Sequence, residues 1–392
     1  MIAGLLFAIQ ETDDRPERLT ATLPFGGVTL IEYQARLLIE AGASQIIILV
    51  ARLTPELLGA VSRIGRRGVT VDAVRHASEA AAKLHPLARV LMLADGLITT
   101  ERVVAMLAGE GGDGLLVMPQ AAAGAVFERL GGAVAWAGVA RLDPRRLGEA
   151  ARLPRDYDAQ STLVRIAEQA RAVHLMLPAD ALAYGHGIER DGAALAARGR
   201  AVLAAIVSDR RGWFDRWLLA PLARLSLPAM IDRRWTGAAV GGVGASVGVL
   251  GLAAVALGWS VTGLALAFAA CLVLGLGATL SGLRDEPRVE RAQRAAGLGI
   301  PALAALFLGA AESGRAGDLT PLSVAIALVT LATLAERAGP EPMRAWWWGS
   351  APAYLLLVLV GTIAGWPVVG MAAAAGYATA TLTAAIERLR QA

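Results

Sequence analysis

The chain of 392 residues has little of the chemistry that marks disulfide-linked or metal-binding proteins. Its one cysteine, Cys271, excludes an internal disulfide framework and a metal site built from several thiolates. The histidines lack the short spacing of metal ligands, and we expect surface or packed positions for all four: His76, His85, His174 and His186. Neither a phosphate-binding P-loop nor a G-x-S-x-G nucleophile motif occurs, so catalytic centres of these kinds are not expected.

Charge is missing altogether from two long stretches. Residues 236–259 and 260–283 contain no Asp, Glu, Lys or Arg, and a membrane-spanning helix needs roughly 20 apolar residues. The mean hydropathy of +0.53, with 56% hydrophobic residues, is high for a soluble protein. We therefore expect a membrane domain to begin after Trp235.

More apolar runs follow, at 297–311, 320–335, 346–366 and 367–386. Together with the first two they predict an all-α domain of six transmembrane helices over 236–392. Small residues four apart in the first run, such as Gly237 and Gly241, predict a helix-packing seam inside this bundle or in a dimer.

Arginines are unevenly distributed around these runs. They gather before the first run, between the second and third, between the fourth and fifth, and at the end, whereas the other loops hold only Arg315 or no basic residue. Because positively charged loops stay in the cytoplasm, we expect a multi-pass protein of the cell inner membrane with its N-terminal domain and C-terminus cytoplasmic. These arginine clusters also account for the pI of 9.7. Because they stand beside the apolar runs, we expect them to contact lipid phosphates, and nucleic acid is not an expected partner.

The first half alternates short apolar runs with amphipathic stretches. The runs rich in Ile, Val and Leu are 2–9, 45–50, 69–74, 90–93 and 114–118. Residues 30–41 have one apolar helical face, and Gly42 supplies a left-handed helix end. This alternation predicts an α/β domain over 1–205, with a mostly parallel sheet in three layers. Residues 206–235 are expected to form an amphipathic interfacial helix and linker.

The order of these pieces resembles the nucleotidyltransferase family that makes NDP-sugars and CDP-alcohols. The matching segments are 23–34 (LPFGGVTLIEYQ), 40–43 (EAGA) before the strand 46–50, 91–96 (LMLADG) and 137–139 (AGV). The resemblance implies a nucleotide-diphospho-sugar-transferase-like fold in which the nucleotide contacts Gly26, Gly27, Asp95 and Gly96. It also implies that Asp95, with a second carboxylate near Asp191, holds Mg²⁺. From the residues alone, Asp95 followed by Gly96 is equally typical of a turn at the end of a strand.

Two parts of that family's pattern are missing. The family has a glycine-rich loop with an arginine after its first strand, and a lysine just before the proline that corresponds to Pro24. Here residues 10–18 (QETDDRPER) contain four acidic residues and no glycine, and the only lysine is Lys83. A phosphate cradle needs close backbone approach and positive potential, and this loop offers neither.

The membrane half resembles the CDP-alcohol phosphotransferase family, in its expected six spans and in the amphipathic stretch 215–225 before them. The family signature, D-x-x-D-G-x-x-A-R-x(8)-G-x-x-x-D-x-x-x-D, holds divalent ions through its carboxylates and begins at the cytoplasmic end of the second span. In the matching register its four aspartates are replaced by Ser281, Arg284, Ala302 and Leu306. Two Mg²⁺ ions need hard anionic oxygen ligands, so we expect metal-dependent chemistry to be lost there.

Arginines stand in this region instead, at Arg284, Arg288, Arg291 and Arg294. One interpretation is that they are topogenic charges on a solvated helix face. The other is that Arg284, Arg288 and Arg291 bind the phosphate of a lipid or nucleotide without converting it.

The whole layout resembles fusions of the two families, which act as inositol-phosphate cytidylyltransferase and di-inositol-phosphate-phosphate synthase, with both catalytic signatures degenerate. Our first hypothesis is a non-catalytic relative in phospholipid head-group biosynthesis that supports an active enzyme. Membrane lipid, an active homologue or a second copy would be its partners. The alternative is an active cytidylyltransferase fused to a CDP-alcohol phosphatidyltransferase, with Mg²⁺, CTP and a CDP-alcohol. A transporter is a third hypothesis, which the lack of ionisable residues within the spans disfavours.

Overall fold

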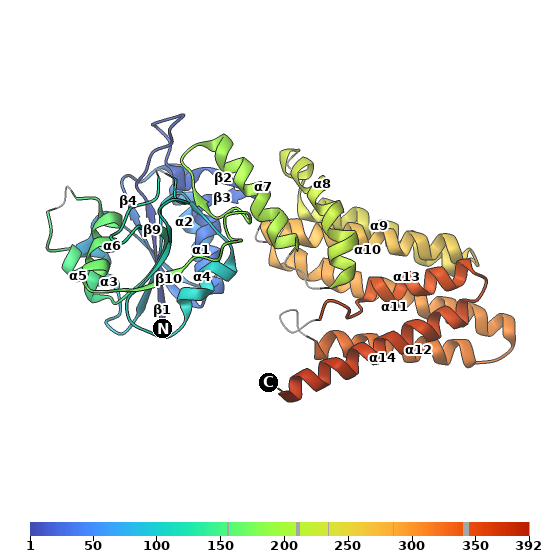
Figure 1. Ribbon diagram of the computed structural model, residues 1–392. Helices are drawn as coiled ribbons and strands as arrows, with labels where there is room; N and C mark the ends of the chain where they lie inside the picture. Colours follow the sequence, from blue (N-terminus) through green and yellow to red (C-terminus); the bar gives the residue numbers. More distant parts are fainter. Residues whose placement is uncertain are drawn as a thin grey trace. The chain divides into compact units, whose positions relative to one another are not determined.

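A computed structural model describes residues 1–124, 126–154, 157–208, 212–233, 235–284, 286–339 and 345–391. The chain divides into two compact units, residues 1–205 and 206–392 (Figure 1). The first unit is an α/β domain, and the second is a helical region.

The α/β domain contains a seven-stranded sheet with the order β10-β8-β9-β6-β1-β4-β5. All neighbours run parallel except β9, which is antiparallel to β6 and β8. The strands are β1 (Ile2–Ala8), β4 (Ala43–Val50), β5 (Thr70–Val74), β6 (Arg89–Leu93), β8 (Gly114–Pro119), β9 (Val134–Leu142) and β10 (Val173–Met176). The mostly parallel sheet is confirmed, and the five expected strands are β1, β4, β5, β6 and β8.

Helices cover both faces of this sheet (Figure 1). One face carries α1 (Leu30–Glu40), α2 (Pro55–Gly65) and α4 (Glu101–Ala108). The other face carries α3 (Ala77–Lys83), α5 (Arg145–Ala150) and α6 (Ala159–Gln169). Because neither face meets water, the central strands contain long buried apolar runs, as in β1 and in residues 46–50 of β4.

Smaller elements lie near the carboxyl ends of the parallel strands. The hairpin of β2 (Pro24–Phe25) and β3 (Val28–Thr29) follows η1 (Thr20–Thr22) and leads into α1. After β6, β7 (Leu97–Ile98) pairs antiparallel with β11 (Gly187–Ile188), and α7 (Gly192–Ser208) follows. These elements bring the loop after β1, the end of β6 and residues 187–191 together.

The helical region holds five helices long and apolar enough to cross a membrane, among the residues that the structure describes. They are α9 (Gly237–Ala256), α10 (Ser260–Leu283), α11 (Pro287–Ala316), α12 (Thr320–Ala338) and α14 (Pro367–Gln391). The protein is therefore a multi-pass membrane protein, and the expected count of six spans is wrong.

The difference lies in the run 346–366. Its helix, α13 (Ala351–Ile363), has only 13 residues, which corresponds to about 20 Å of rise, short of a hydrocarbon core of about 30 Å. Residues 345–350 before it are not helical, and Pro352 stands in the first turn, where proline has no helical N–H to lose.

The segment 345–350 is instead held by α14. The Thr381 hydroxyl accepts the Gly349 N–H at 3.2 Å, and Tyr377 donates to the Trp347 carbonyl at 2.5 Å. Trp348 packs on Ala385 in a buried cluster. Irregular backbone is tolerated at membrane depth where protein covers it. These contacts cover part of the segment, whereas Trp346 and Trp347 are 70% and 36% exposed, as aromatic residues at a membrane interface are.

Ahead of the spans stand η2 (Asp215–Leu219), a turn of π-helix, and α8 (Ala220–Asp232). Leu219, Ala223 and Leu227 on one side pack against α9 and α10. Trp217 and Leu225 on the other are 71% and 80% exposed. Such an element, apolar on an exposed side, is suited to the headgroup layer.

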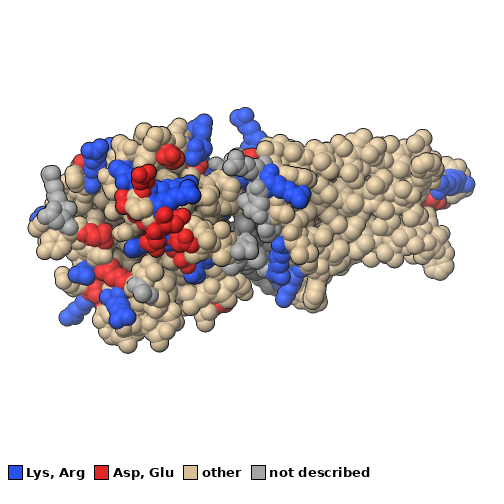
Figure 2. Space-filling view, turned by 90° about the horizontal axis from the view of Figure 1, so that it is seen from above, with Lys and Arg blue, Asp and Glu red and all other residues tan. Residues whose placement is uncertain are grey.

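The two units differ in how many charged residues they expose. On the face seen in Figure 2, the α/β domain shows Lys, Arg, Asp and Glu together, whereas the long sides of the helical region show almost none. Exposed tryptophans stand at the ends of the apolar helices, including Trp259 before α10 and Trp366 before α14. Aromatic residues are typical of membrane interfaces, which supports the assignment of these helices as spans.

Candidate functional site

Asp95 lies two residues after the end of β6, at the sheet edge where α/β proteins bind ligands. It is 5% exposed, and its Oδ2 accepts the backbone N–H groups of Ile9 and Gln10, both at 2.8 Å. Its own N–H donates to Gln160 Oε1 at 2.8 Å. Burial raises the pKa of Asp95 to about 6, although the N–H groups of Gln10 and Ile9 act to lower it. One carboxylate oxygen is thus committed to fixing the loop after β1.

That loop is closed by hydrogen bonds within the protein. The N–H of Thr12 donates to the Arg18 carbonyl at 2.9 Å, and that of Asp13 to the Arg190 carbonyl at 3.3 Å. The N–H of Arg15 donates to the Thr12 hydroxyl at 3.2 Å. A phosphate cradle needs N–H groups that point at the ligand, whereas these, with those of Ile9 and Gln10, already have acceptors.

Gly26 and Gly27 form the turn of the β2–β3 hairpin. Their φ angles of +60° and +94° are those of a two-residue turn that twists with its strands. Nothing lies within 4 Å of the position that a Cβ on Gly26 would take. A hairpin turn therefore accounts for both glycines, and their contact with a nucleotide stays a prediction.

Asp191 and Gly96 belong to the same corner of the domain as Asp95. The N–H of Glu189 donates to the Gly96 carbonyl at 3.0 Å, which joins the two segments. Gly96 has φ +75°, and a Cβ there would lie 2.6 Å from the Glu189 carbonyl oxygen. Asp191 Oδ2 accepts the Ala194 N–H at 2.8 Å, as a cap on the first turn of α7. The corner is tightly closed by backbone contact.

No cluster of three or more His, Cys, Asp or Glu suited to a metal occurs among the described residues. A magnesium site with substrate phosphate needs only one or two carboxylates. Asp95 Oδ1, which is buried and has no hydrogen-bond partner among the described atoms, fits such a ligand. The predicted Mg²⁺ role of Asp95 with Asp191 therefore stays a prediction.

His186 is a packed histidine. It is 1% exposed, its Nδ1 lies 2.9 Å from Thr99 Oγ1, and its ring stacks on Phe127. Burial lowers its pKa to about 4. The ring is therefore neutral at physiological pH, which suits a structural contact.

The membrane half has a buried polar cluster where the phosphotransferase signature would begin. Ser281, near the end of α10, is fully buried and donates from Oγ to Gln293 Oε1 at 3.0 Å. Gln293, on α11, is 4% exposed and donates from Nε2 to the Gly237 carbonyl at 2.7 Å. This cluster of Gly237, Ser281 and Gln293 joins α9, α10 and α11.

Gln293 is a residue that the sequence comparison missed. The matching register placed Ala302 and Leu306 at the last two aspartates of the signature and named no partner for Ser281, whereas the structure shows Gln293 in contact with it. Ala302 instead lines a cavity with α12 and α13. Little in the sequence signalled this contact, because Gln293 stands between Arg291 and Arg294 in a charged stretch, where a polar side chain is ordinary.

The predicted phosphate-binding arginines lie around this cluster. Arg284 is half-buried at the end of α10, and its Nε has no hydrogen-bond partner among the described atoms. Arg288 and Arg291 are exposed, and Arg291 donates to the Pro287 carbonyl at 3.0 Å. Arg294 pairs with Glu290 on its own helix. Phosphate binding by these arginines stays a prediction.

Neither a search of protein-family models nor a search of curated proteins finds a match to this chain. What is established is a membrane protein with a soluble α/β domain.

Proposed function

We propose that this protein is a non-catalytic relative of the cytidylyltransferase and CDP-alcohol phosphotransferase fusions, which supports an active enzyme of phospholipid head-group synthesis. The observation that carries the proposal is that, at the two places where those families hold nucleotide and metal, the polar groups of this chain bind one another. Asp95 Oδ2 and the N–H groups of Ile9 and Gln10 bind one another. The Ser281 and Gln293 side chains likewise bind each other.

Charge supports the same proposal. The loop 10–18 carries four acidic residues, which would repel a triphosphate. Near Ser281, the carboxylate of Glu286 is accompanied by Arg284, Arg288 and Arg291, and Glu290 pairs with Arg294. The guanidinium groups offset these carboxylates and would repel Mg²⁺. The predicted cytoplasmic position of the α/β domain would place it beside enzymes that use soluble nucleotides and alcohols.

The alternative, an active cytidylyltransferase, is favoured by one observation. Asp95 keeps a buried oxygen, Oδ1, without a hydrogen-bond partner among the described atoms, and a Mg²⁺ ion could use it. Asp95→Asn separates the two proposals because it keeps the acceptor for Ile9 and Gln10 and removes the negative charge.

The test is a turnover assay on the full-length protein in lipid nanodiscs. With Mg²⁺, CTP and inositol phosphate or glycerol phosphate, we expect no pyrophosphate release above a heat-denatured blank. With a CDP-alcohol and the same acceptors, we expect no CMP release. Release that Asp95→Asn abolishes, with Asp14→Asn as the matched control, would overturn the proposal for the α/β domain.

The supporting role is tested separately. Co-expression with an active CDP-alcohol phosphotransferase should raise that enzyme's yield or specific activity, and the two should co-purify in mild detergent. If the active enzyme is unchanged by the presence of this protein, the supporting role is wrong.

A further inference from the structure

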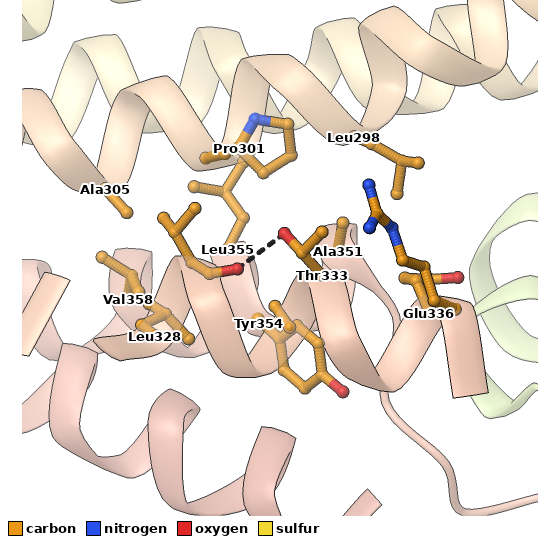
Figure 3. Close-up of a pocket in the computed structure, with 14 residues that line it drawn as sticks. Leu298, Pro301, Ala305, Leu328, Thr333, Glu336, Ala351, Tyr354, Leu355 and Val358 are labelled. Carbon is orange, nitrogen blue, oxygen red and sulfur yellow. Dashed lines mark hydrogen bonds between the residues drawn. The ribbon is translucent and has the colours of Figure 1, made fainter. Parts of the chain in front are cut away.

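A cavity of about 200 Å³ lies among α11, α12 and α13 (Figure 3). It exists because small side chains meet there, including Ala302 and Ala305 of α11, Ala332 of α12 and Ala351 of α13. Its walls are otherwise mostly apolar. An apolar cavity of this kind does not hold ordered water, since water needs polar partners.

The cavity has a closed floor and an open side. On the floor, Tyr354, Leu355 and Val358 of α13 are all buried. On the other side, Leu298 of α11 is 46% exposed and Thr333 of α12 is exposed as well. The opening therefore lies between α11 and α12, on helices whose outer surfaces face lipid in a membrane.

The two ends of the cavity differ in charge. Glu336 and Arg337 line one end, and Figure 3 shows Glu336 beside Leu298 there, with Ala305, Leu328 and Val358 at the other end. Arg337 is exposed and stands one residue before the end of α12. The end of a 19-residue membrane helix lies at the level of the lipid phosphates, because such a helix is about as long as the hydrocarbon core is thick.

The dimensions match one leaflet. From Arg337 to Leu328 the lining residues of α12 cover about 14 Å at roughly 1.5 Å per residue, close to half of a hydrocarbon core of about 30 Å. An apolar cavity of about 150 Å³ can hold benzene, so 200 Å³ suits part of one hydrocarbon chain. It is too small for a nucleotide or a whole lipid.

We propose that this cavity binds one acyl chain of a membrane phospholipid, with the lipid phosphate on the guanidinium of Arg337. Arginine suits a phosphate because its planar donors match two oxygens at once. The inference is independent of the proposed function, since a lipid could occupy this cavity in an enzyme or in a non-catalytic relative.

The test is native mass spectrometry of the full-length protein, delipidated in detergent and then given one lipid. The probes are phosphatidylglycerol, diacylglycerol with the same chains, and glycerol phosphate, which has no chains. We expect one bound phosphatidylglycerol per chain, weaker binding of diacylglycerol, and no binding of glycerol phosphate at the same concentrations. Equal binding of glycerol phosphate would overturn the proposal.

Variants locate the site. Ala302→Phe fills the cavity and should weaken phosphatidylglycerol binding at least about tenfold, or about 1.4 kcal/mol. Ala310→Phe, at an exposed position on the same helix, should leave binding unchanged. Arg337→Gln should weaken phosphatidylglycerol binding and spare diacylglycerol, and Arg390→Gln, exposed on α14, is its control.

Folding is checked by size-exclusion chromatography. Arg337→Gln changes an exposed side chain, so it keeps the test valid even if Ala302→Phe does not fold. Lipid binding unchanged by both variants would refute the site. The proposal would also be refuted if the wild type were a dimer that binds no lipid and Ala302→Phe converted it to a monomer. That result would show that a second copy of the chain occupies this face.

Discussion

The side-chain amide of Gln293 on α11 lies 2.7 Å from the carbonyl oxygen of Gly237, the first residue of α9. A Cβ on Gly237 would lie 2.0 Å from Ser281 Oγ, so only glycine leaves room for this contact. Three membrane helices are thereby joined at one end of the bundle by side chains that are all buried.

Replacing Gln293 by Leu should destabilise the membrane half by about 1 kcal/mol, with an upper bound of about 2. The substitution removes the donor to Gly237 and leaves the Ser281 hydroxyl without its acceptor. Unfolding by SDS from mixed micelles, followed by circular dichroism, measures the change.

A pair of serines gives the control. Ser281→Ala should also destabilise, because Ser281 bonds to another helix. Ser246→Ala should be neutral, because Ser246 is exposed and bonds only to the Gly242 carbonyl of its own helix. Equal effects of the two serine substitutions would contradict a role for the cluster in joining helices.

Glycine packing predicts a second difference. A Cβ on Gly251 would lie 2.8 Å from both the Ala267 nitrogen and the Gly263 carbonyl oxygen of α10, which are backbone atoms. Gly251→Ala should therefore force α9 and α10 apart and cost about 1–3 kcal/mol. Gly237 and Gly241 of the expected seam also face helices of this chain, since Cβ atoms there would lie 2.0 Å from Ser281 Oγ and 2.4 Å from Gln293 Nε2.

Gly242→Ala is the matched control on the same helix. Nothing lies within 4 Å of the position of its Cβ, so the better helix propensity of alanine should stabilise the protein by up to about 1 kcal/mol. Thermal unfolding in detergent compares the two. If Gly251→Ala melts at or above the temperature of Gly242→Ala, the close contact of α9 with α10 is wrong.

Asp95 predicts a pH dependence. Its pKa is raised from 3.8 to about 6 in the folded protein because the carboxyl group is buried, so the folded state binds a proton more tightly than the unfolded chain. The stability that this proton contributes is present below about pH 4 and is lost as pH rises through about 6, roughly 3 kcal/mol in all.

Asp95→Asn should remove this dependence and be more stable than the wild type at pH 8, because the amide oxygen still accepts from Ile9 and Gln10. Hydrogen exchange of the β1 amides at pH 5 and pH 8, corrected for intrinsic rates, measures it. Asp14→Asn, at an exposed position in the loop after β1, should behave like the wild type. Loss of β1 protection in Asp95→Asn at pH 8 would show that the charge itself is needed.

Local patterns predicted the elements whose burial is continuous. The strands β1 and β4 follow from apolar runs that are buried almost throughout. β9 was missed because Gly138 interrupts it with φ +86°, at a place where the pairing with β8 is irregular, and glycine inside a strand weakens the pattern.

Contacts between residues far apart in the sequence could not be predicted from local patterns. Gln293 and Gly237 are 56 residues apart, and no local periodicity relates them. The run 346–366 has the length and composition of a span, yet α14 supplies an acceptor, a donor and packing that allow its first part to stay irregular. Hydropathy measures how well a segment suits lipid, whereas neighbouring helices decide whether its backbone must be helical.

The last prediction concerns the sides of the membrane. The arginines before α9 and those between α10 and α11 favour the cytoplasm for both segments. Three crossings, by α9, α10 and α11, then put the loop at Asp318 on the opposite side from the α/β domain. We therefore expect Asp14 and Asp318, both exposed, to lie on opposite sides of the membrane.

Single cysteines in a Cys271→Ala background test this with a membrane-impermeant maleimide. In sealed right-side-out vesicles Asp318→Cys should be labelled at once, and Asp14→Cys only after permeabilisation. Labelling of both before permeabilisation, or of Asp14→Cys alone, would contradict the orientation. If neither cysteine is labelled until the vesicles are opened, both segments lie inside, and one of the three helices α9–α11 does not cross the membrane. Because the assay reads only the first three helices, its result does not depend on how α13 lies in the membrane.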